Sequence, residues 1–473
     1  MYSPSQHVFN SSLIWLNQWC RRETQVNNHS FLTRLAGFGA AQALVVDGVP
    51  HDYTSLCALV DDWSAELDRR GVNAGDVVCL EAAYSPAACA ALLALTVRGA
   101  IIVPLSAVPP AKRAEFLAVA EVESVVTMKP NGSHTFTTTG VTATHPLYER
   151  LRATATPGLV LFSSGTSGRS KASLLDFDKV LGRYGQPTRP RRTLSFLSLD
   201  HIGGVNTLLH TFSQGGAIVT VPERSPDAVF AAIERDRVSV LPTTPTFLTM
   251  ALVSRAYERH STESLELITY GTEPMPPKTL ARLRSALPAV RLKQTYGLSE
   301  LGIMPTRSRD DDSLWLKLGG AGFDHKIVDD VLWVRSDMAM LGYLNAPADF
   351  DADGYFNTQD VVQVDGDYVR ILGRRSEIIN VGGEKVYPSE VEGVLLEMPN
   401  IADATVSGRA SHVTGMVVKA TIQLIEDEDE RALRRRVREF CGRRLEPFKV
   451  PVVVEVNSQR QYSDRFKKIR SVR

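Results

Sequence analysis

The most informative segment of the sequence is Leu159-Val-Leu-Phe162, followed by Ser163-Ser-Gly-Thr-Ser-Gly-Arg-Ser-Lys171. An apolar strand runs directly into a loop of glycines and hydroxyls that closes on a lysine. Gly165 and Gly168 permit positive φ, so backbone N–H groups can converge on an anion. Further donors are the hydroxyls of Ser163, Ser164, Thr166 and Ser167 and the ammonium of Lys171. The pattern predicts a phosphate-binding loop at the end of a buried strand.

This loop is not a Walker loop. The GxxxxGK[ST] spacing is absent, and Lys171 is followed by Ala172, which has no hydroxyl to hold magnesium. A P-loop kinase or GTPase is therefore disfavoured. A flexible Ser/Gly linker is the other alternative, but a linker does not normally follow a buried strand or end in Arg169 and Lys171.

The chain on both sides of the loop alternates between helical and strand patterns. The first series is a helix capped by Thr54 and ended by Gly71, a strand over 77–80, a helix from Ser85 to Gly99, and a strand over 101–103. The second series is a strand over 217–221, a helix over 227–235, and strands over 238–241, 265–270 and 290–293. Such alternation predicts an α/β fold with largely parallel sheets, built as two stacked subdomains.

The pattern changes near Val331, where short strands over 331–335 and 367–372 are separated by Asp/Gly turns. A small α+β unit follows Arg375, with a helix over 388–396, a strand over 416–425 and a charged helix over 428–444. We therefore predict a large N-terminal domain, 1–373, made of stacked α/β subdomains plus a small β-subdomain. A small α+β C-terminal domain, 374–473, follows on a hinge. The first fifty residues are unassigned; Trp15 and Trp19 would share one helix face.

Composition narrows the class of protein. A chain of 473 residues with 44% apolar and 22% charged residues predicts two or more globular domains. Lysine plus arginine equals aspartate plus glutamate, 53 each, so no net field favours nucleic acid. The five cysteines are scattered and predict neither disulfides nor a zinc site. We see no secretory signal, and the apolar stretch 87–95 is far short of the roughly 20 residues that span a bilayer. We expect a cytoplasmic protein.

Four segments, in order, resemble the adenylate-forming superfamily of acyl-CoA synthetases, carrier-protein-loading adenylation enzymes and luciferases. The first is the phosphate loop. The second, Gln294-Thr-Tyr-Gly-Leu-Ser-Glu300, is similar to the family's Tyr-Gly-x-Thr/Ser-Glu, and Asn357-Thr-Gln-Asp360 is similar to its Thr-Gly-Asp. The fourth, 373–392, is similar to the hinge segment that opens the small domain. One such match would be weak, but four in order are specific.

The resemblance implies ATP and Mg²⁺ as ligands and assigns residues to them. Glu300 would hold Mg²⁺ beside the nucleotide phosphates. Tyr296 would pack against adenine, Asp360 would accept hydrogen bonds from the ribose, and Arg374 would help to place the same sugar. Without the resemblance, Tyr296 would be interpreted as a core tyrosine and the three charged residues as ordinary surface or turn residues. Other residues expected at the nucleotide are Gly271, Thr272, Glu273, Gly297 and Ser299.

The acid is expected near Leu199-Asp-His-Ile-Gly-Gly204, which resembles the family segment that lines the acyl pocket. His201 would gate the pocket or orient the carboxylate, and Asp200 is a candidate to contact a polar group of the substrate. The sequence does not identify the acid. Candidates for the wall of its pocket are Thr244, Thr246, Phe247 and Tyr270.

The C-terminal segment Tyr462-Ser-Asp-Arg-Phe-Lys-Lys-Ile-Arg470 stands where the family has Thr-x-x-Gly-Lys-x-x-Arg. The resemblance implies that one lysine is catalytic. Lys467 is favoured because placing it at the catalytic position also aligns Ser463 and Arg470 with their counterparts in the family. If Lys468 is placed there instead, Ile469 fits the family's usual apolar position. The family's glycine is missing, and the hinge carries Ser376 where the family more often has Asp or Lys.

The function implied is ATP-dependent activation of a small carboxylic acid, giving an acyl-adenylate and pyrophosphate, and then transfer of the acyl group to the thiol of CoA. Gly382 and Gly383 would let the backbone approach the pantetheine arm, unless they only form a tight turn. Candidates for contacts with the CoA phosphates are Lys385, Arg409 and Lys419. One alternative is an enzyme that loads the phosphopantetheine of an acyl or peptidyl carrier protein or uses another nucleophile. A non-catalytic nucleotide-binding homologue is the other.

Overall fold

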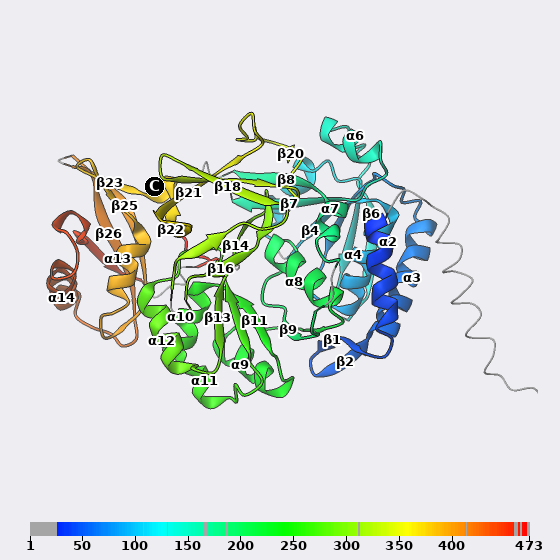
Figure 1. Cartoon of the computed structure of the whole chain (residues 1–473). Coiled ribbons are helices and arrows are strands. Elements are labelled where there is room, and N and C mark those ends of the chain that lie inside the picture. The colour runs from blue at the N-terminus through cyan, green and yellow to red at the C-terminus, as the bar shows by residue number, and fades with distance from the viewer. Residues whose placement is uncertain are drawn as a thin grey trace, which may run out of the picture.

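The computed structural model describes residues 26–106, 108–129, 131–164, 169–185, 188–310, 313–412, 414–457, 462–463 and 466–470. The elements up to β22 form one large body, and those from β23 onward form a smaller body at its side (Figure 1). The fold is α/β, with two stacked sheets, a small β-subdomain and a small α+β unit, as the sequence predicted.

The first large sheet carries the phosphate loop. Its strands, in spatial order, are β20 (Gly342–Tyr343), β8 (Ser170–Asp176), β7 (Gly158–Ser164), β4 (Ile101–Leu105), β3 (Val77–Glu81), β5 (Ser124–Met128) and β6 (His134–Thr138). The four central strands, β7, β4, β3 and β5, are parallel, and the strands added at both edges are antiparallel. Every residue of β4 is buried, which is typical of a strand covered by helices on both faces.

The second large sheet carries the segments expected to bind the acid. Its strands, in spatial order, are β13 (Arg291–Gln294), β12 (Leu267–Tyr270), β11 (Val240–Thr243), β9 (Arg192–Leu194), β10 (Ala217–Val219), β1 (Gln42–Val46) and β2 (Val49–Asp52). All neighbours are parallel except β1 and β2, which form a hairpin. The first fifty residues, which the sequence left unassigned, thus add strands to this sheet.

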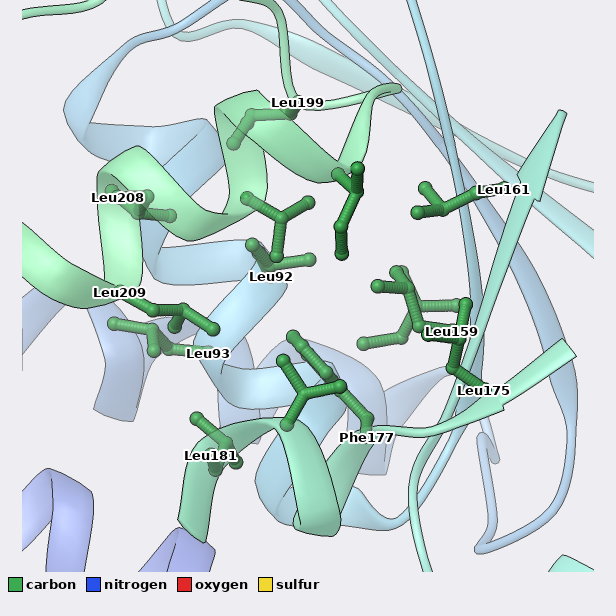
Figure 2. Close-up of a cluster of buried hydrophobic side chains, with 14 of the residues drawn as sticks. Leu92, Leu93, Leu159, Leu161, Leu175, Phe177, Leu181, Leu199, Leu208 and Leu209 are labelled. Carbon is green, nitrogen blue, oxygen red and sulfur yellow. The ribbon is translucent and has the colours of Figure 1, made fainter. Parts of the chain in front are cut away.

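Helices lie between the two sheets and on their outer faces. The core between the sheets combines α4 (Pro86–Arg98) and α8 (Ile202–Ser213) with side chains of both sheets. Figure 2 shows Leu92 of α4 between Leu208 of α8 and the strand residue Leu159; Leu93 and Leu209 belong to the same core. The other helices of the large body are α2 (Val26–Gly37), α3 (Tyr53–Arg69), α5 (Pro110–Val119), α6 (Pro146–Arg152), α7 (Phe177–Gly182), α9 (Pro226–Arg235), α10 (Pro245–Ser254), α11 (Ala256–Arg259) and α12 (Pro277–Ala286).

The β-subdomain and the C-terminal body follow. The β-subdomain consists of β16 (Thr306–Ser308), β17 (Leu316–Leu318), β22 (Tyr368–Arg374), β21 (Phe356–Asp365), β19 (Val331–Ser336) and β18 (Phe323–Val328), with the hairpin β14 (Tyr296–Leu298) and β15 (Gly302–Met304) beside it. The C-terminal body consists of η2 (Arg375–Glu377), β23 (Ile379–Val381), β24 (Glu384–Val386), α13 (Pro388–Leu395), β25 (Ile401–Ser411), β26 (Gly415–Leu424), α14 (Glu430–Gly442), η3 (Pro447–Lys449) and β27 (Val453–Val456). Among the described residues, the buried members of its hydrophobic core lie between Ile379 and Val454.

Most predicted elements are present, with shifts at their ends. Ser85 caps α4, and Gly99 ends it at a φ of +74°, as predicted. The predicted cap of α3 is wrong: Asp52, not Thr54, accepts the hydrogen bond from the Ser55 N–H. The strand predicted over 238–241 is β11, displaced by two residues. Trp15 and Trp19 lie outside the described residues, and no described helix is long and apolar enough to cross a membrane.

Candidate active site

The phosphate loop is the turn of a hairpin. β7 and β8 pair antiparallel, with Ser163 opposite Lys171 and Ser164 opposite Ser170. Lys171 Nζ lies 4.8 Å from the centre of the Tyr343 ring, and the Ser163 hydroxyl donates to Glu300 Oε1 at 3.4 Å. The remaining predicted phosphate contacts lie outside the described residues; these are the side chain of Ser164 and all of Gly165, Thr166, Ser167 and Gly168.

Glu300 is buried beside this hairpin, with 7% of its surface exposed. Its Oε1 accepts a 2.7 Å hydrogen bond from the hydroxyl of Tyr343, a residue that the sequence analysis missed. Burial, together with the neighbouring carboxylate, raises the pKa of that phenol, so Tyr343 remains a donor. Because β20 has only two residues, no local pattern marks Tyr343.

The chemistry of Glu300 fits a magnesium ligand. Both of its hydrogen bonds end on Oε1, and Oε2 has no hydrogen-bond partner among the described residues. Mg²⁺ prefers carboxylate oxygen and is usually held by one or two carboxylates together with substrate phosphates. The described part of the chain contains no group of three or more His, Cys, Asp or Glu side chains that could hold a metal by themselves.

A second group of predicted residues meets at Asp360. The Tyr296 hydroxyl donates to Asp360 Oδ2 at 2.6 Å, and Arg374 Nε lies 3.4 Å from Asp360 Oδ1. The pairing of β21 with β22 sets Asp360 opposite Arg374. Burial raises the pKa of Asp360, although Arg374 and Tyr296 both favour its charged form. Gln359, at the family's glycine position, keeps a positive φ of +60°.

The segment after β12 is shaped by close backbone contacts. A Cβ on Gly271 would lie 2.7 Å from the Thr295 carbonyl oxygen, and one on Gly297 would lie 2.6 Å from the Gly302 carbonyl oxygen. Both glycines are therefore required by packing. Ser299 is buried in the turn between β14 and β15.

The carboxylate of Glu273 lies at the N-terminus of α10. Its Oε1 accepts from the Thr246 N–H at 2.8 Å, and its Oε2 accepts from the Lys468 N–H at 3.3 Å. A carboxylate at a helix N-terminus is favourable because the N–H groups there lack partners within the helix. Burial raises the pKa of Glu273. The described contacts of Glu273 thus tie it to α10 and to the C-terminal segment.

His201 caps α8 and faces a small cavity. Its Nδ1 accepts a hydrogen bond from the Gly203 N–H at 3.0 Å, so in the neutral ring the proton is on Nε2. The cavity has an accessible volume of about 10 Å³, which is room for roughly one water molecule. It is lined by Leu197, Ser198, His201, Arg224, Thr272 and Lys467.

The two candidate lysines have different environments. Lys467 lines the cavity with His201. Lys468 is turned into the C-terminal body, where its Nζ lies 2.9 Å from Asp403 Oδ1 and 3.9 Å from Glu392 Oε2. Arg470 joins the same buried cluster through Glu392, at 2.7 Å. Of these two lysines, Lys467 is the one whose side chain lines the cavity of the large body.

Several candidates for the acid pocket contact other parts of the protein instead. Asp200 accepts hydrogen bonds from Ser106, at 2.7 Å, and from Ser198. The Thr244 hydroxyl donates to the Phe466 carbonyl at 2.8 Å, and the Phe247 ring packs against the Phe466 ring. The segment around Thr244 therefore supports the C-terminal segment.

The predicted thiol-binding glycines lie apart from these groups. Gly382 and Gly383, with φ of +61° and +96°, form the exposed turn between β23 and β24, where the Gly383 N–H donates to Asn380 Oδ1 at 2.9 Å. No described hydrogen bond joins them to the residues of the large body. Of the basic candidates, Lys419 pairs with Glu455 at 2.7 Å, whereas Lys385 and Arg409 are exposed.

Comparison with known proteins identifies the family. A model described as AMP-binding enzyme matches residues 31–344, and one described as AMP-binding enzyme C-terminal domain matches 390–461. An indoleacetate–CoA ligase of Aromatoleum aromaticum is 30% identical over 298 residues, which are 57% of this chain and 58% of that relative. 4-Coumarate–CoA ligase 2 of Oryza sativa subsp. japonica is 29% identical over 331 residues, which are 62% of this chain and 57% of that relative.

The chain thus matches somewhat under three fifths of the length of these two relatives. Among solved structures, the anthranilate CoA ligase AuaEII, in complex with anthranoyl-AMP, superposes with a TM-score of 0.79 at 19% identity. That comparison covers 95% of this chain and 97% of the other, so the fold is shared over nearly its whole length. The family match, which covers well over half of the sequence, shows that this chain belongs to the AMP-binding enzymes.

Proposed function

We propose that this protein is an ATP-dependent acid–thiol ligase that forms an acyl-adenylate and transfers the acyl group to CoA. The observation that carries the proposal is the meeting of Lys467, from the C-terminal segment, with His201 and Thr272 of the large body around one cavity. A non-catalytic homologue has no need to bring a lysine from the distant C-terminal segment to the predicted carboxylate segment.

In the first step, a carboxylate oxygen of the acid attacks the α-phosphorus of ATP, and pyrophosphate leaves. Negative charge increases on the phosphate oxygens, so positioning and electrostatic stabilisation supply most of the catalysis. We assign the stabilising cation to Lys467 rather than to Lys468, whose ammonium is already paired with Asp403. His201 can donate from Nε2 to the attacking carboxylate and orient it.

The nucleotide would bind along the groups that meet at Asp360 and Glu300. Asp360 would accept from the ribose, with Arg374 and Tyr296 holding its carboxylate in position. Lys171 and the hydroxyls of the phosphate loop would contact the phosphates. Bound at Glu300, Mg²⁺ would neutralise phosphate charge and polarise the reacting phosphoryl group.

In the second step, a thiol sulfur attacks the carbonyl carbon of the adenylate. The bond from that carbon to the phosphate oxygen breaks, AMP leaves, and the thiol proton passes to water. We propose that the small domain, taken as 374–473, turns on the residues after Arg374 and brings Gly382 and Gly383 to the pantetheine arm.

The acid is proposed to be aromatic. Two relatives are ligases of indoleacetate and 4-coumarate, and a third, a 2-succinylbenzoate–CoA ligase of Bacillus licheniformis, is 31% identical over 320 residues. Cys57, Cys79, Cys89 and Cys441 are free thiols, which favours a reducing compartment such as the cytoplasm.

Carboxylate-dependent exchange of pyrophosphate into ATP tests the first step. A panel of aryl, fatty and amino acids should give exchange with one class, and product mass with CoA should give the thioester. Exchange without a CoA thioester would assign the acyl group to a carrier-protein phosphopantetheine or to an amine, which the same assay can test. If no acid supports exchange, the ligase proposal is wrong and the non-catalytic homologue replaces it.

A further inference from the structure

We propose that Phe466 is a positioning residue that latches the C-terminal segment onto the large body, places Lys467 in its cavity, and favours adenylate formation over acyl transfer. The proposal rests on the function proposed above, in which Lys467 serves the first step. Phe466 occupies the position at which the family has glycine. The presence of an aromatic side chain at this position therefore needs a structural reason.

The backbone at Phe466 keeps a conformation that suits glycine. Its φ is +52°, in the left-handed region that a bulky side chain rarely adopts. A tight turn imposes this conformation: the Phe466 N–H donates to the Ser463 carbonyl at 2.8 Å, and the Ser463 N–H donates to the Lys467 carbonyl at 2.9 Å. Phenylalanine therefore carries a conformational cost at this position that its side-chain contacts must offset.

Those contacts are made almost entirely with the large body. The Phe466 ring is 5% exposed and belongs to the core cluster beneath the second sheet. Its centre lies 4.9 Å from that of Phe196 and 5.8 Å from that of Phe247, and the guanidinium of Arg224 lies 5.5 Å from it. Tyr462, of the same segment, stacks on the ring at 5.3 Å.

The ion pairs of the segment belong to the small domain. Lys468 pairs with Asp403, and Arg470 pairs with Glu392 and Glu377. If the small domain turns as a unit, these ion pairs can travel with it, whereas the contacts of the Phe466 ring must break. Turning then exposes an aromatic ring and opens a gap in the core of the large body, both of which are unfavourable. Glycine in place of Phe466 would remove the ring contacts and leave the backbone hydrogen bonds to Thr244 and Glu273 among the described contacts to break.

The consequence is a shift between the two half-reactions. The latch keeps Lys467 beside His201, which favours the first step, and it resists the movement needed for the second. Removing the ring should therefore change the two steps in opposite directions, a result that general loss of structure does not produce.

The experiment compares wild type with F466A, F466G and F466Y in two assays. The first is ATP–pyrophosphate exchange; the second is thioester formation from purified acyl-adenylate and CoA without ATP. We expect F466A and F466G to lower exchange about tenfold or more and to raise transfer severalfold, because a buried aromatic side chain stabilises the latched state by that order. F466Y, which keeps the ring, should retain most of the wild-type ratio. An equal fall in both steps, or no change in either, would overturn the proposal.

A structural readout separates this proposal from the assignment of Lys467. Brief trypsin treatment, read by mass spectrometry, reports cleavage after Lys468 and Arg470. Cleavage should be faster in F466A and F466G than in wild type and unchanged in K467A, which lacks the proposed catalytic ammonium but keeps the ring. If K467A retains exchange, the catalytic assignment fails while the latch can still stand. If F466A is cleaved no faster than wild type, the proposed latch is wrong, whatever the two activity assays give. If F466A does not fold, F466L is used in its place.

Discussion

Lys467 and Lys468 are adjacent in sequence, but their side chains contact different parts of the molecule. Lys467 lines the cavity beside His201, whereas Lys468 Nζ lies 2.9 Å from Asp403 Oδ1 within the C-terminal body. Only 6% of the Lys468 side chain is exposed. The left-handed Phe466 precedes the pair, and a β-bridge between Tyr462 and Lys468 closes the turn. The turn therefore sends one lysine to each body.

The first prediction separates the two lysines. K467A should lower ATP–pyrophosphate exchange by about a hundredfold or more, because a positioned charge at the reacting phosphate is lost. Its thermal unfolding midpoint should stay near that of wild type. K467A with full exchange would show that the cation for the first step comes from elsewhere.

K468A should lower the stability of the protein, because it leaves Asp403 buried without its cation. We expect a loss of about 3–5 kcal/mol in the free energy of unfolding, measured by urea denaturation. K419A is the matched control: it removes a lysine from the partly exposed pair with Glu455 and should cost only about 0–1 kcal/mol. Equal losses in the two variants would contradict a buried ion cluster.

The next prediction concerns Glu300 and Tyr343. E300Q removes the carboxylate charge expected to bind Mg²⁺, so half-maximal exchange should need a roughly tenfold or higher Mg²⁺ concentration. Y343F removes only the 2.7 Å hydrogen bond to Oε1 and should raise that requirement less. A Mg²⁺ titration of exchange at fixed ATP measures both. An E300Q profile identical to wild type would exclude Glu300 as a ligand.

The sequence predicted the fold well where signals are local. The Ser85 cap and the Gly99 terminus of α4 are short-range features, and the structure has both. The hairpin of β1 and β2 was missed because its strands are short and β1 enters a sheet next to β10, which is far along the chain. Thr54 was mistaken for a cap because an aspartate two residues earlier satisfies the same helix terminus.

The site was less accessible to sequence reasoning. Motif positions predicted roles for Glu300, Asp360 and Lys467, which stay predictions, and the contacts of these residues with their partners are tertiary. Tyr343 reaches Glu300 from a two-residue strand. Glu273, which the sequence placed at the nucleotide, accepts hydrogen bonds from α10 and from the C-terminal segment. The sequence shows that the family's glycine is missing from the C-terminal segment. It does not show that the Phe466 ring packs into the core of the large body, because that contact depends on tertiary packing.

A further prediction tests the glycine turn of the small domain. At Gly382 the φ is +61°, and a Cβ would meet no heavy atom within 4 Å. G382A should therefore lower the free energy of unfolding by about 1–2 kcal/mol through the left-handed backbone alone. Exchange should be unchanged, and thioester formation should fall only if the pantetheine arm passes this turn. Unaltered thioester formation would leave Gly382 as a turn residue.

The last prediction concerns the pH dependence of the buried cluster. Burial acts to raise the pKa of Glu392, but Arg470 and Lys468 outweigh it and hold that pKa below its ordinary value of 4.5. A carboxyl group whose pKa is lower in the folded state adds stability above its unfolded pKa and loses it as the pH falls through its folded pKa. E392Q should therefore be less stable than wild type by about 3–5 kcal/mol at pH 7. The difference should shrink as the pH falls below 4.5 and through the lower folded-state pKa of Glu392, where the wild-type carboxylate also becomes neutral. Urea denaturation from pH 7 to pH 3 measures this difference. A difference independent of pH would assign the loss to packing rather than to charge.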